Sequence, residues 1–323
     1  MVELHCHLDG SLRLSTLEEL LRQKNCPIPE DIRFHPGMGM QEALSKFLTT
    51  LSALQEPDAV ERVTREICED AREFRHLHTE IRFAPQLHLG APTEEIVDAA
   101  ISGLDENANL ILCGLYGEPP RILNNLVEIA RTRPRVVGID LAGAPLKDHR
   151  YHLMDYDEPF TRARELGIGR TVHAAEGRSP KEIDVAINFL HAQRIGHGLT
   201  LLEDWKTLDL VLERGVTIEA CITSNWHTGA ISHPSKHPIK QWVDQGVKVA
   251  ICADNILLSD TVLPIEYTRA NQQCGLSYKD ISICKANAQQ AIFKRRKQWH
   301  KKRNNGKKER EPVLTPKTVQ ERN

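Results

Sequence analysis

The sequence lacks any apolar run long enough to cross a membrane. Of its 323 residues, 40% are hydrophobic and 27% are charged, whereas a membrane-spanning helix needs about 20 consecutive apolar residues. The first residues, from Met1 to His5, contain neither the basic segment nor the apolar segment of a secretory signal peptide. The hydrophobic content is also too high for an intrinsically disordered chain. These absences predict a globular, cytoplasmic protein without a membrane partner.

Closely spaced cysteines are also absent. The eight cysteines are scattered along the chain, and no two of them form a CxxC pair. A disulfide framework and a zinc site made of thiolates both depend on such clusters, so neither is expected.

The formal net charge of −2 hides an uneven distribution of charge. Residues 294–323 contain 12 Lys and Arg residues and three Glu residues, whereas residues 1–293 contain 30 basic and 41 acidic residues. The C-terminal segment has little beyond Trp299 that could pack, so we expect a basic, disordered tail. Basic segments can also bind nucleic acids or carry targeting signals, but basic termini are common, and a solvated extension is the favoured interpretation.

Short apolar or β-branched segments alternate with longer amphipathic segments in the rest of the chain. The predicted strands are 2–8, 79–85, 110–115, 136–142, 170–174, 194–198, 216–222 and 248–253. The predicted helices are 15–24, 40–54, 57–74, 93–104, 120–131, 156–166, 180–190, 203–213 and 237–245. This is the pattern of an α/β protein with a (β/α)8 TIM barrel and extra helices after the first strand, although a doubly wound sheet shows the same alternation. No repeat or linker divides the segment, so we expect one barrel domain over 1–293 and the tail over 294–323.

Two histidine motifs fall at the ends of predicted strands, where barrel enzymes carry their catalytic groups. In His5-Cys6-His7-Leu8-Asp9-Gly10 the two histidines project from the same face of a strand. Converging imidazoles suit Zn²⁺ or a similar ion, but an isolated pair is more often two core or surface histidines. In Thr171-Val172-His173-Ala174-Ala175-Glu176-Gly177 a third histidine ends a strand. Glu176 is then either a further ligand or a proton shuttle beside a metal.

Two more polar motifs also follow predicted strands. His197 lies between two glycines, which allow backbone or substrate to approach closely. Asp254 and Asn255 end the last strand, where the alternative interpretation is a helix N-cap. In a barrel, the motifs would bring six polar groups to one mouth: His5, His7, His173, Glu176, His197 and Asp254.

These motifs, with Gly138-Ile139-Asp140-Leu141-Ala142-Gly143 and Ser224-Asn225, resemble those of the metal-dependent adenosine deaminase family. That family belongs to the amidohydrolase superfamily of (β/α)8 barrels. The resemblance implies zinc-dependent hydrolytic deamination of adenosine, or of a related 6-aminopurine nucleoside, to inosine and ammonia. It is not to the zinc deaminases of the cytidine type, because the sequence contains no PCxxC motif.

The resemblance also implies a role for each matched residue. The ligands of one Zn²⁺ per chain would be His5, His7, His173 and Asp254. Glu176 would protonate purine N1, and His197 would serve as base and electrostatic partner of the water that the metal activates for attack on C6. The substrate would be held by His7 and Asp9 at the ribose, by Gly143 at the purine and by Asn255 at N7.

Three positions depart from the family pattern. Asn255 replaces a second aspartate, and its amide can donate to N7 without first being protonated. Ile222 replaces a proline and Ala253 replaces a threonine, and both changes could alter metal affinity or rate. In the segment that follows Asn225, Trp226 could either stack on a base or simply pack.

Several alternatives are left open. The substrate could instead be adenine or a modified nucleoside such as aminofutalosine or a methylthio-nucleoside. AMP is disfavoured, because Arg13 is the only cation near Asp9 in the sequence. A non-catalytic barrel that binds purines or nucleic acid is a third alternative, which the complete set of predicted ligands and catalytic residues argues against. The oligomeric state cannot be predicted.

Overall fold

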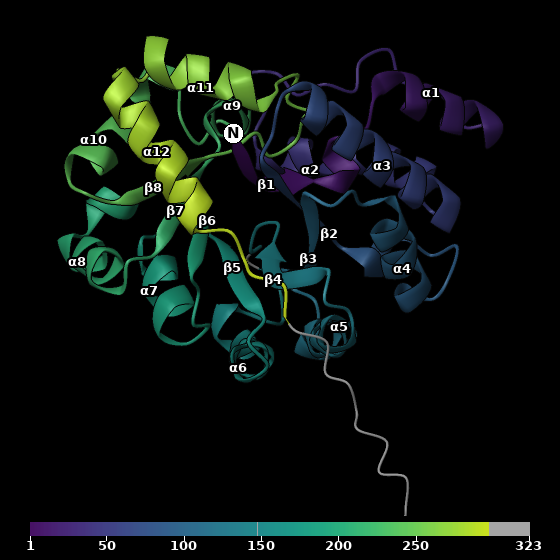
Figure 1. The fold of residues 1–323 in the computed structure, drawn as a ribbon, viewed down its shortest axis with the longest axis horizontal. Coiled ribbons are helices and arrows are strands. Elements are labelled where there is room, and N and C mark those ends of the chain that lie inside the picture. The colour runs from purple at the N-terminus through teal and green to yellow at the C-terminus, as the bar shows by residue number, and fades with distance from the viewer. Residues whose placement is uncertain (147, 297–323) are drawn as a thin grey trace, which may run out of the picture.

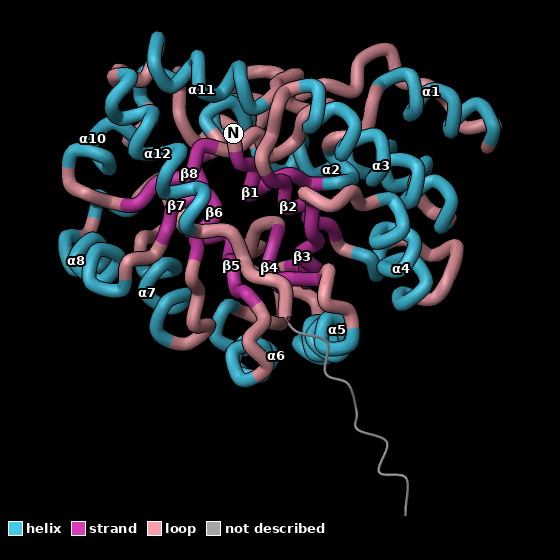
Figure 2. The backbone as a smooth tube through the Cα atoms, viewed as in Figure 1, coloured by secondary structure: helices cyan, strands magenta, loops and turns pink. Residues whose placement is uncertain are grey.

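The computed structural model describes residues 1–146 and 148–296 as a parallel β-sheet inside a ring of helices (Figure 1, Figure 2). Its eight strands are β1 Val2–His7, β2 His78–Phe83, β3 Ala108–Leu115, β4 Val136–Ala142, β5 Gly169–Ala174, β6 Arg194–His197, β7 Thr217–Ala220 and β8 Lys248–Ile251. Each strand pairs in parallel with the next one along the chain, in the order β1 to β8. Backbone hydrogen bonds of 2.8 Å from His7 N to Asp254 O and from Asp254 N to His5 O join the two ends of the sheet. The predicted (β/α)8 barrel is confirmed.

Helices connect the strands and cover the outside of the sheet (Figure 2). They are α1 Leu14–Gln23, α2 Met40–Ala53, α3 Pro57–Glu73, α4 Thr93–Gly103, α5 Pro120–Thr132, α6 Asp157–Glu165, α7 Lys181–Asn188, α8 Trp205–Arg214, α9 Ile222–His227, α10 Ile239–Asp244, α11 Leu263–Gln272 and α12 Tyr278–Gln290. Short 3₁₀ turns span Leu8–Gly10, Pro85–Leu87, Leu153–Tyr156, Leu201–Glu203 and Pro234–Lys236. The extra helices expected after the first strand are α1, α2 and α3. Within the described ranges, every helix is too short or too polar to cross a membrane.

The predicted strand limits agree with the structure to within two residues at every end. The strand predicted over 216–222 stops at Ala220 because Ile222 begins α9, which was not predicted, and α11 and α12 were also missed. Thr93 is the first residue of α4 rather than its cap; Pro92 occupies the N-cap position and makes no side-chain capping bond.

Phe293 closes the N-terminal end of the barrel, which we call the floor. A Cβ atom added to Gly169 would lie 2.3 Å from Cγ of the Phe293 ring, and one added to Gly138 would lie 2.8 Å from Cδ2. The Arg194 guanidinium lies 3.8 Å from the centroid of the same ring. Glycine near the starts of β4 and β5 therefore leaves the space in which the Phe293 ring packs.

The first residues of the basic C-terminal segment contact the barrel. Arg295 Nε donates to Asn109 Oδ1 at 2.7 Å, and Arg296 Nη2 donates to Val136 O at 3.0 Å. Arg296 also donates to Ala130 O near the end of α5, a carbonyl that accepts from Arg133 N as well. Residues 294–296 thus belong with the barrel floor. The predicted disorder of the remaining tail concerns residues 297–323, which lie outside the described residues, and it stays a prediction.

Candidate active site

The four predicted metal ligands converge at the mouth of the barrel, at the carboxyl ends of the strands. His5 and His7 belong to β1, His173 belongs to β5, and Asp254 follows β8. His7 Nε2 lies 3.2 Å from both His5 Nε2 and His173 Nε2. Asp254 Oδ1 lies 3.6 Å from His5 Nε2 and 3.5 Å from His7 Nε2. Neighbouring donor atoms of a tetrahedral site with Zn–N bonds of about 2.0–2.1 Å are about 3.3 Å apart, so the spacing fits.

The other ring nitrogens show why these contacts are not ordinary hydrogen bonds. His5 Nδ1 lies 2.7 Å from Glu219 Oε2, and His173 Nδ1 lies 3.1 Å from Asp140 Oδ2. Carboxylates accept protons, so each ring carries its hydrogen on Nδ1 and presents a lone pair at Nε2. Burial lowers the pKa of His5 well below its usual value, and the ring is neutral. The Nε2 lone pairs of His5 and His173 both face His7 Nε2, an arrangement that suits a metal cation.

Arg82 supports both carboxylates from below. Its Nη1 lies 2.8 Å from Asp140 Oδ2, and its Nη2 lies 2.9 Å from Glu219 Oε2. The side chains of Arg82, Asp140 and Glu219 are all completely buried. A single guanidinium therefore fixes the two groups that orient His5 and His173, because its planar fork can bond two carboxylates at once.

Three residues at the strand ends adopt the left-handed backbone conformation that L-residues avoid. The φ angles are +57° at Ala175 and +69° at both His197 and Asp254. Such conformations persist where the surrounding structure enforces them, and they cluster at functional sites. Gly196 supplies the necessary room, since a Cβ atom there would lie 3.0 Å from His5 Cε1. The group that approaches Gly196 is the His5 side chain, whereas the sequence had suggested backbone or substrate.

Glu176 lies beside the histidine cluster and is buried. Its Oε1 accepts from Asn225 Nδ2 at 3.1 Å and from Thr228 Oγ1 at 3.3 Å, and its Oε2 lies 3.7 Å from His197 Nε2. Burial raises the pKa of Glu176, and the two hydrogen bonds only partly oppose this effect. Glu182 Oε2 accepts from Ala175 N at 2.7 Å and so fixes the bend that carries the carboxyl group.

His197 completes the cluster but has a different partner. Its Nδ1 accepts a hydrogen bond of 3.0 Å from Asn225 Nδ2, and its ring centroid lies 5.1 Å from that of His173. Burial lowers the pKa of His197 to about 3, so this ring is neutral too. A nitrogen of His197 also lies within 4.8 Å of donor atoms of His5 and His173. By distance alone, His197 is therefore a further candidate ligand.

The three residues expected only at the substrate lie around the same mouth. Asp9 is buried, its Oδ1 has no hydrogen-bond partner, and burial raises its pKa to about 7. Asn255 Nδ2 donates to Asp254 Oδ1 at 2.6 Å, which leaves the second N–H of the amide free. Gly143 has a φ of +78°, and open space surrounds the position of a Cβ atom there.

Other residues noted in the sequence lie apart from this cluster. The Trp226 ring packs near His227, with 5.5 Å between centroids, and the Arg269 guanidinium lies 5.6 Å from its centroid, so Trp226 packs in this structure. In the segment that follows, His233 caps a 3₁₀ turn, and His237 accepts from Ile239 N before α10.

A family model described as adenosine deaminase matches residues 1–304. The chain belongs to the adenosine deaminase family. This family is metal-dependent, and His5, His7 and Asp254 form one group of donor atoms within 4.8 Å of one another that could hold a metal ion, whereas His5, His173 and His197 form another.

Individual members and structures agree with this assignment to the adenosine deaminase family. The adenosine deaminase of Clostridium kluyveri is 32% identical over 314 residues, which span 90% of this chain and 88% of that protein. A solved structure of Arabidopsis ADAL complexed with IMP has a TM-score of 0.81 and 25% identity, and the alignment covers 90% of this chain and 91% of that one. An amidohydrolase from Burkholderia ambifaria with bound Zn has a TM-score of 0.81 at 21% identity, with 90% and 85% coverage, and shows likeness in fold alone.

For this adenosine deaminase family member, the motifs predicted the side chains at the mouth but not their supports. Arg82, Glu182 and Thr228 were not singled out, and no role was given to Asp140 or Glu219. A signal for three of them was present, because Arg82, Asp140 and Glu219 are charged residues inside segments that were predicted to be strands of the barrel. Such residues are almost never fully buried unless they are paired.

Proposed function

We propose that this protein is a zinc-dependent adenosine deaminase that hydrolyses adenosine to inosine and ammonia. The observation that carries the proposal is the convergence of three imidazole nitrogens and one carboxylate oxygen, 3.2–3.6 Å apart, beside the buried carboxyl group of Glu176. The family of the chain and its similarity to the C. kluyveri adenosine deaminase support the choice of reaction and substrate.

The metal would be held by His5, His7, His173 and Asp254. Neutral imidazoles with one carboxylate suit Zn²⁺, whereas Mg²⁺ and Ca²⁺ prefer oxygen ligands. When bound, zinc supplies a Lewis acid that lowers the pKa of water to about 7 and so makes a nucleophile available at neutral pH. Glu219 and Asp140, each bonded to a histidine Nδ1, keep the Nε2 lone pairs directed at that point.

Glu176 donates the proton that purine N1 takes up. Burial raises the pKa of this carboxyl group, which favours the protonated form that a proton donor needs. Asn225 and Thr228 both bond Oε1, so the proton belongs on Oε2, the oxygen that faces His197. Protonation at N1 removes the aromatic resistance of the ring to attack at C6, and ammonia then leaves from the tetrahedral carbon.

His197 orients and stabilises the oxygen that attacks C6. Because its Nδ1 accepts from Asn225, the hydrogen of the neutral ring is on Nε2 and points toward the mouth. In this tautomer His197 acts as a hydrogen-bond donor and electrostatic partner. For His197 to act as a base through Nε2, the side-chain amide of Asn225 would have to be flipped, so that its oxygen accepts a hydrogen bond from Nδ1.

The arrangement favours a nucleoside over a nucleotide. Asp9 offers an unpaired carboxylate oxygen for a ribose hydroxyl, Gly143 offers open backbone to the purine, and Asn255 offers a free N–H to N7. Arg13, the cation nearest to Asp9 in the sequence, lies 2.6 Å from Asp70 and is not free to meet a phosphate.

A substrate panel tests the proposed function. Purified protein should carry about one zinc per chain and release ammonia fastest from adenosine, compared with deoxyadenosine, adenine, AMP and aminofutalosine at a fixed enzyme concentration. Glu176→Gln should lower kcat by about 10²–10⁴-fold without loss of zinc, whereas the exposed Glu158→Gln should change neither. A folded, zinc-loaded protein that releases no ammonia from any of these compounds would contradict the proposal.

A further inference from the structure

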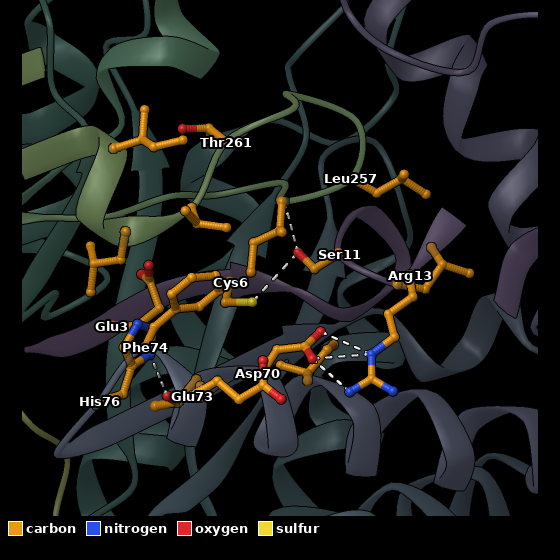
Figure 3. A pocket seen from close by; sticks show the side chains of 18 of the residues that line it. Glu3, Cys6, Ser11, Arg13, Asp70, Glu73, Phe74, His76, Leu257 and Thr261 are labelled. Atoms are coloured by element: carbon orange, nitrogen blue, oxygen red, sulfur yellow. Dashed lines mark hydrogen bonds and ion pairs between the residues drawn. The ribbon is translucent and has the colours of Figure 1, made fainter. Parts of the chain in front are cut away.

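Strand β1 contains a β-bulge between Glu3 and Cys6, the stretch that includes His5. Glu3 pairs with Thr79 of β2 and Cys6 pairs with Ile81, so β1 has one more residue than β2 between these positions. Strict alternation would place Glu3 on the same face as His5 and His7. The extra residue breaks this alternation, and Glu3 lies with Cys6 on the outer side of the barrel, where both line a cavity (Figure 3).

The carboxylate of Glu3 joins β1 to β8 at the seam where the sheet closes. Its Oε1 accepts from His5 N and its Oε2 accepts from Ala253 N, both at 2.9 Å, and Glu3 is 1% exposed. Burial raises the pKa of Glu3, and the two backbone N–H groups oppose that rise because they favour the ionised carboxylate. His5 is a predicted metal ligand, and Ala253 precedes another, Asp254. One outer carboxylate therefore fixes the backbone at two ligands.

The cavity beside Glu3 is separate from the barrel mouth. It has a volume of about 470 Å³ and lies between β1, α3 and the segment that leads into α11. Its walls include the apolar side chains of Leu12, Ile67 and Leu263. Phe74 and Ile265 at its edge are about 40% exposed, so a small molecule can enter from solvent without passing the histidines. In Figure 3 the side chain of Glu3 borders this space.

We propose that Glu3 is a positioning residue for the metal centre, acting from outside the barrel, and that a small carboxylate entering through this cavity can replace its side chain. The inference rests on the proposed function in one respect, namely that His5 and Asp254 bind a metal. Without the Glu3 carboxylate, the N–H groups of His5 and Ala253 lose the one acceptor group that joins them, and water from the cavity can bond each N–H group but does not tie the two strands together. The bulge then relaxes, and the β1 and β8 ligands move relative to each other.

The test combines loss of the side chain with chemical rescue. Glu3→Ala should weaken zinc binding about 10–100-fold, measured by competition with a chromophoric chelator. Formate should restore zinc affinity in a saturable manner, because it brings two acceptor oxygens into the space left by Glu3. Formamide has a similar size but only one acceptor oxygen, and it should not restore affinity. Glu73→Ala, which changes another acidic residue of the same cavity, should bind zinc like the wild type.

A second variant covers the case in which Glu3→Ala does not fold. Glu3→Gln keeps the volume but turns one acceptor into a donor that faces an N–H group, so it should weaken zinc binding at an unchanged melting temperature of the metal-free protein. Wild-type zinc affinity in folded Glu3→Gln, or equal rescue of Glu3→Ala by formate and formamide, would overturn the proposal. Zinc affinity is measured without substrate, so a wild type that binds zinc but releases no ammonia defeats only the proposed function.

Discussion

The mouth and the floor of the barrel are both buried and polar, but they are built in opposite ways. At the floor, opposite charges lie together: Arg194 lies 2.7 Å from both Glu80 and Glu219, and its guanidinium covers the Phe293 ring. At the mouth, like groups lie together, because His7 Nε2 lies 3.2 Å from Nε2 of both His5 and His173. The charges of the floor are paired with one another within the protein. The donor atoms of the mouth are instead arranged so that a bound cation would stabilise them.

Glu219 connects these two regions. Its Oε1 lies 2.7 Å from Arg194 at the floor, and its Oε2 lies 2.7 Å from His5 Nδ1 at the mouth. Arg82 lies 2.9 Å from the same Oε2. The ion pairs of the floor thus fix the carboxylate that holds His5 at the mouth. Mutations can test whether the two regions contribute separately to stability and to turnover.

The largest effect is expected at the mouth. His173→Ala removes one ligand and one imidazole from the cluster, and turnover of adenosine should fall by about ten-thousandfold or more, equivalent to about 5.5 kcal/mol. Relief of the contacts between lone pairs should leave the metal-free protein as stable as the wild type or more stable. Zinc content and chemical unfolding of the metal-free protein measure both effects. A clear loss of stability in the metal-free variant would mean that His173 stabilises the folded protein without a metal, as the ion pairs of the floor do.

The converse is expected at the floor. Arg194→Met leaves Glu80 and Glu219 without their shared cation and should lower the free energy of unfolding by about 3–5 kcal/mol. Turnover per folded molecule should change little, because Arg82 still holds Glu219. The double variant Glu80→Gln with Arg194→Met should recover part of the stability in urea unfolding. A loss of turnover as large as that of His173→Ala would break the distinction between the two regions.

A buried histidine outside the cluster separates the effect of burial from that of metal binding. Burial lowers the pKa of His237 to about 3, below an unfolded value of about 6.5. Between pH 6.5 and 3, the unfolded chain therefore binds a proton at His237 that the folded chain does not bind. The free energy of unfolding decreases as the pH falls through this range, by about 1.4 kcal/mol per pH unit. His237→Asn, which keeps an acceptor for Ile239 N, should flatten the profile of unfolding free energy against pH. An unchanged slope would assign the acid sensitivity to other groups.

The smallest effect is expected from Asn255→Asp. The amide already donates to Asp254, and an aspartate there must hold a proton before it can donate to N7. At neutral pH kcat/KM for adenosine should fall about tenfold, the value of one hydrogen bond, and it should recover as the pH falls and the new carboxyl group is protonated. Equal kcat/KM values at every pH would show that Asn255 does not contact the substrate.

The sequence predicted the strands of the barrel because apolar and β-branched segments recur between amphipathic ones. It did not predict α9, because Ile222 and Thr223 are β-branched and continue the pattern of the preceding strand. The C-terminal helices α11 and α12, which lie beyond the last predicted strand, were not predicted either. Their place is set by packing at the end of the barrel, a long-range effect that local patterns do not contain.

The side chains of the site were predictable because strand ends meet at one mouth in a parallel barrel. Their supports were less accessible to such reasoning. The role of Glu3 depends on a bulge that reverses the expected face of one residue, and no local sequence pattern predicts that extra residue. The network around Arg82 joins strands that are far apart in the chain, and only the closed barrel shows which carboxylates it bonds.

The hydrogen bonds between β1 and the segment after β8 also determine when the barrel can close during synthesis of the chain. Strand β1 is synthesised first, and its free edge receives the hydrogen bonds of Asp254 only after β8 has been made. At about 5–20 residues per second, that wait is roughly 10–50 seconds. During translation, the first two predicted metal ligands therefore sit on an open strand edge, and the ion can be enclosed only when synthesis has nearly completed the barrel.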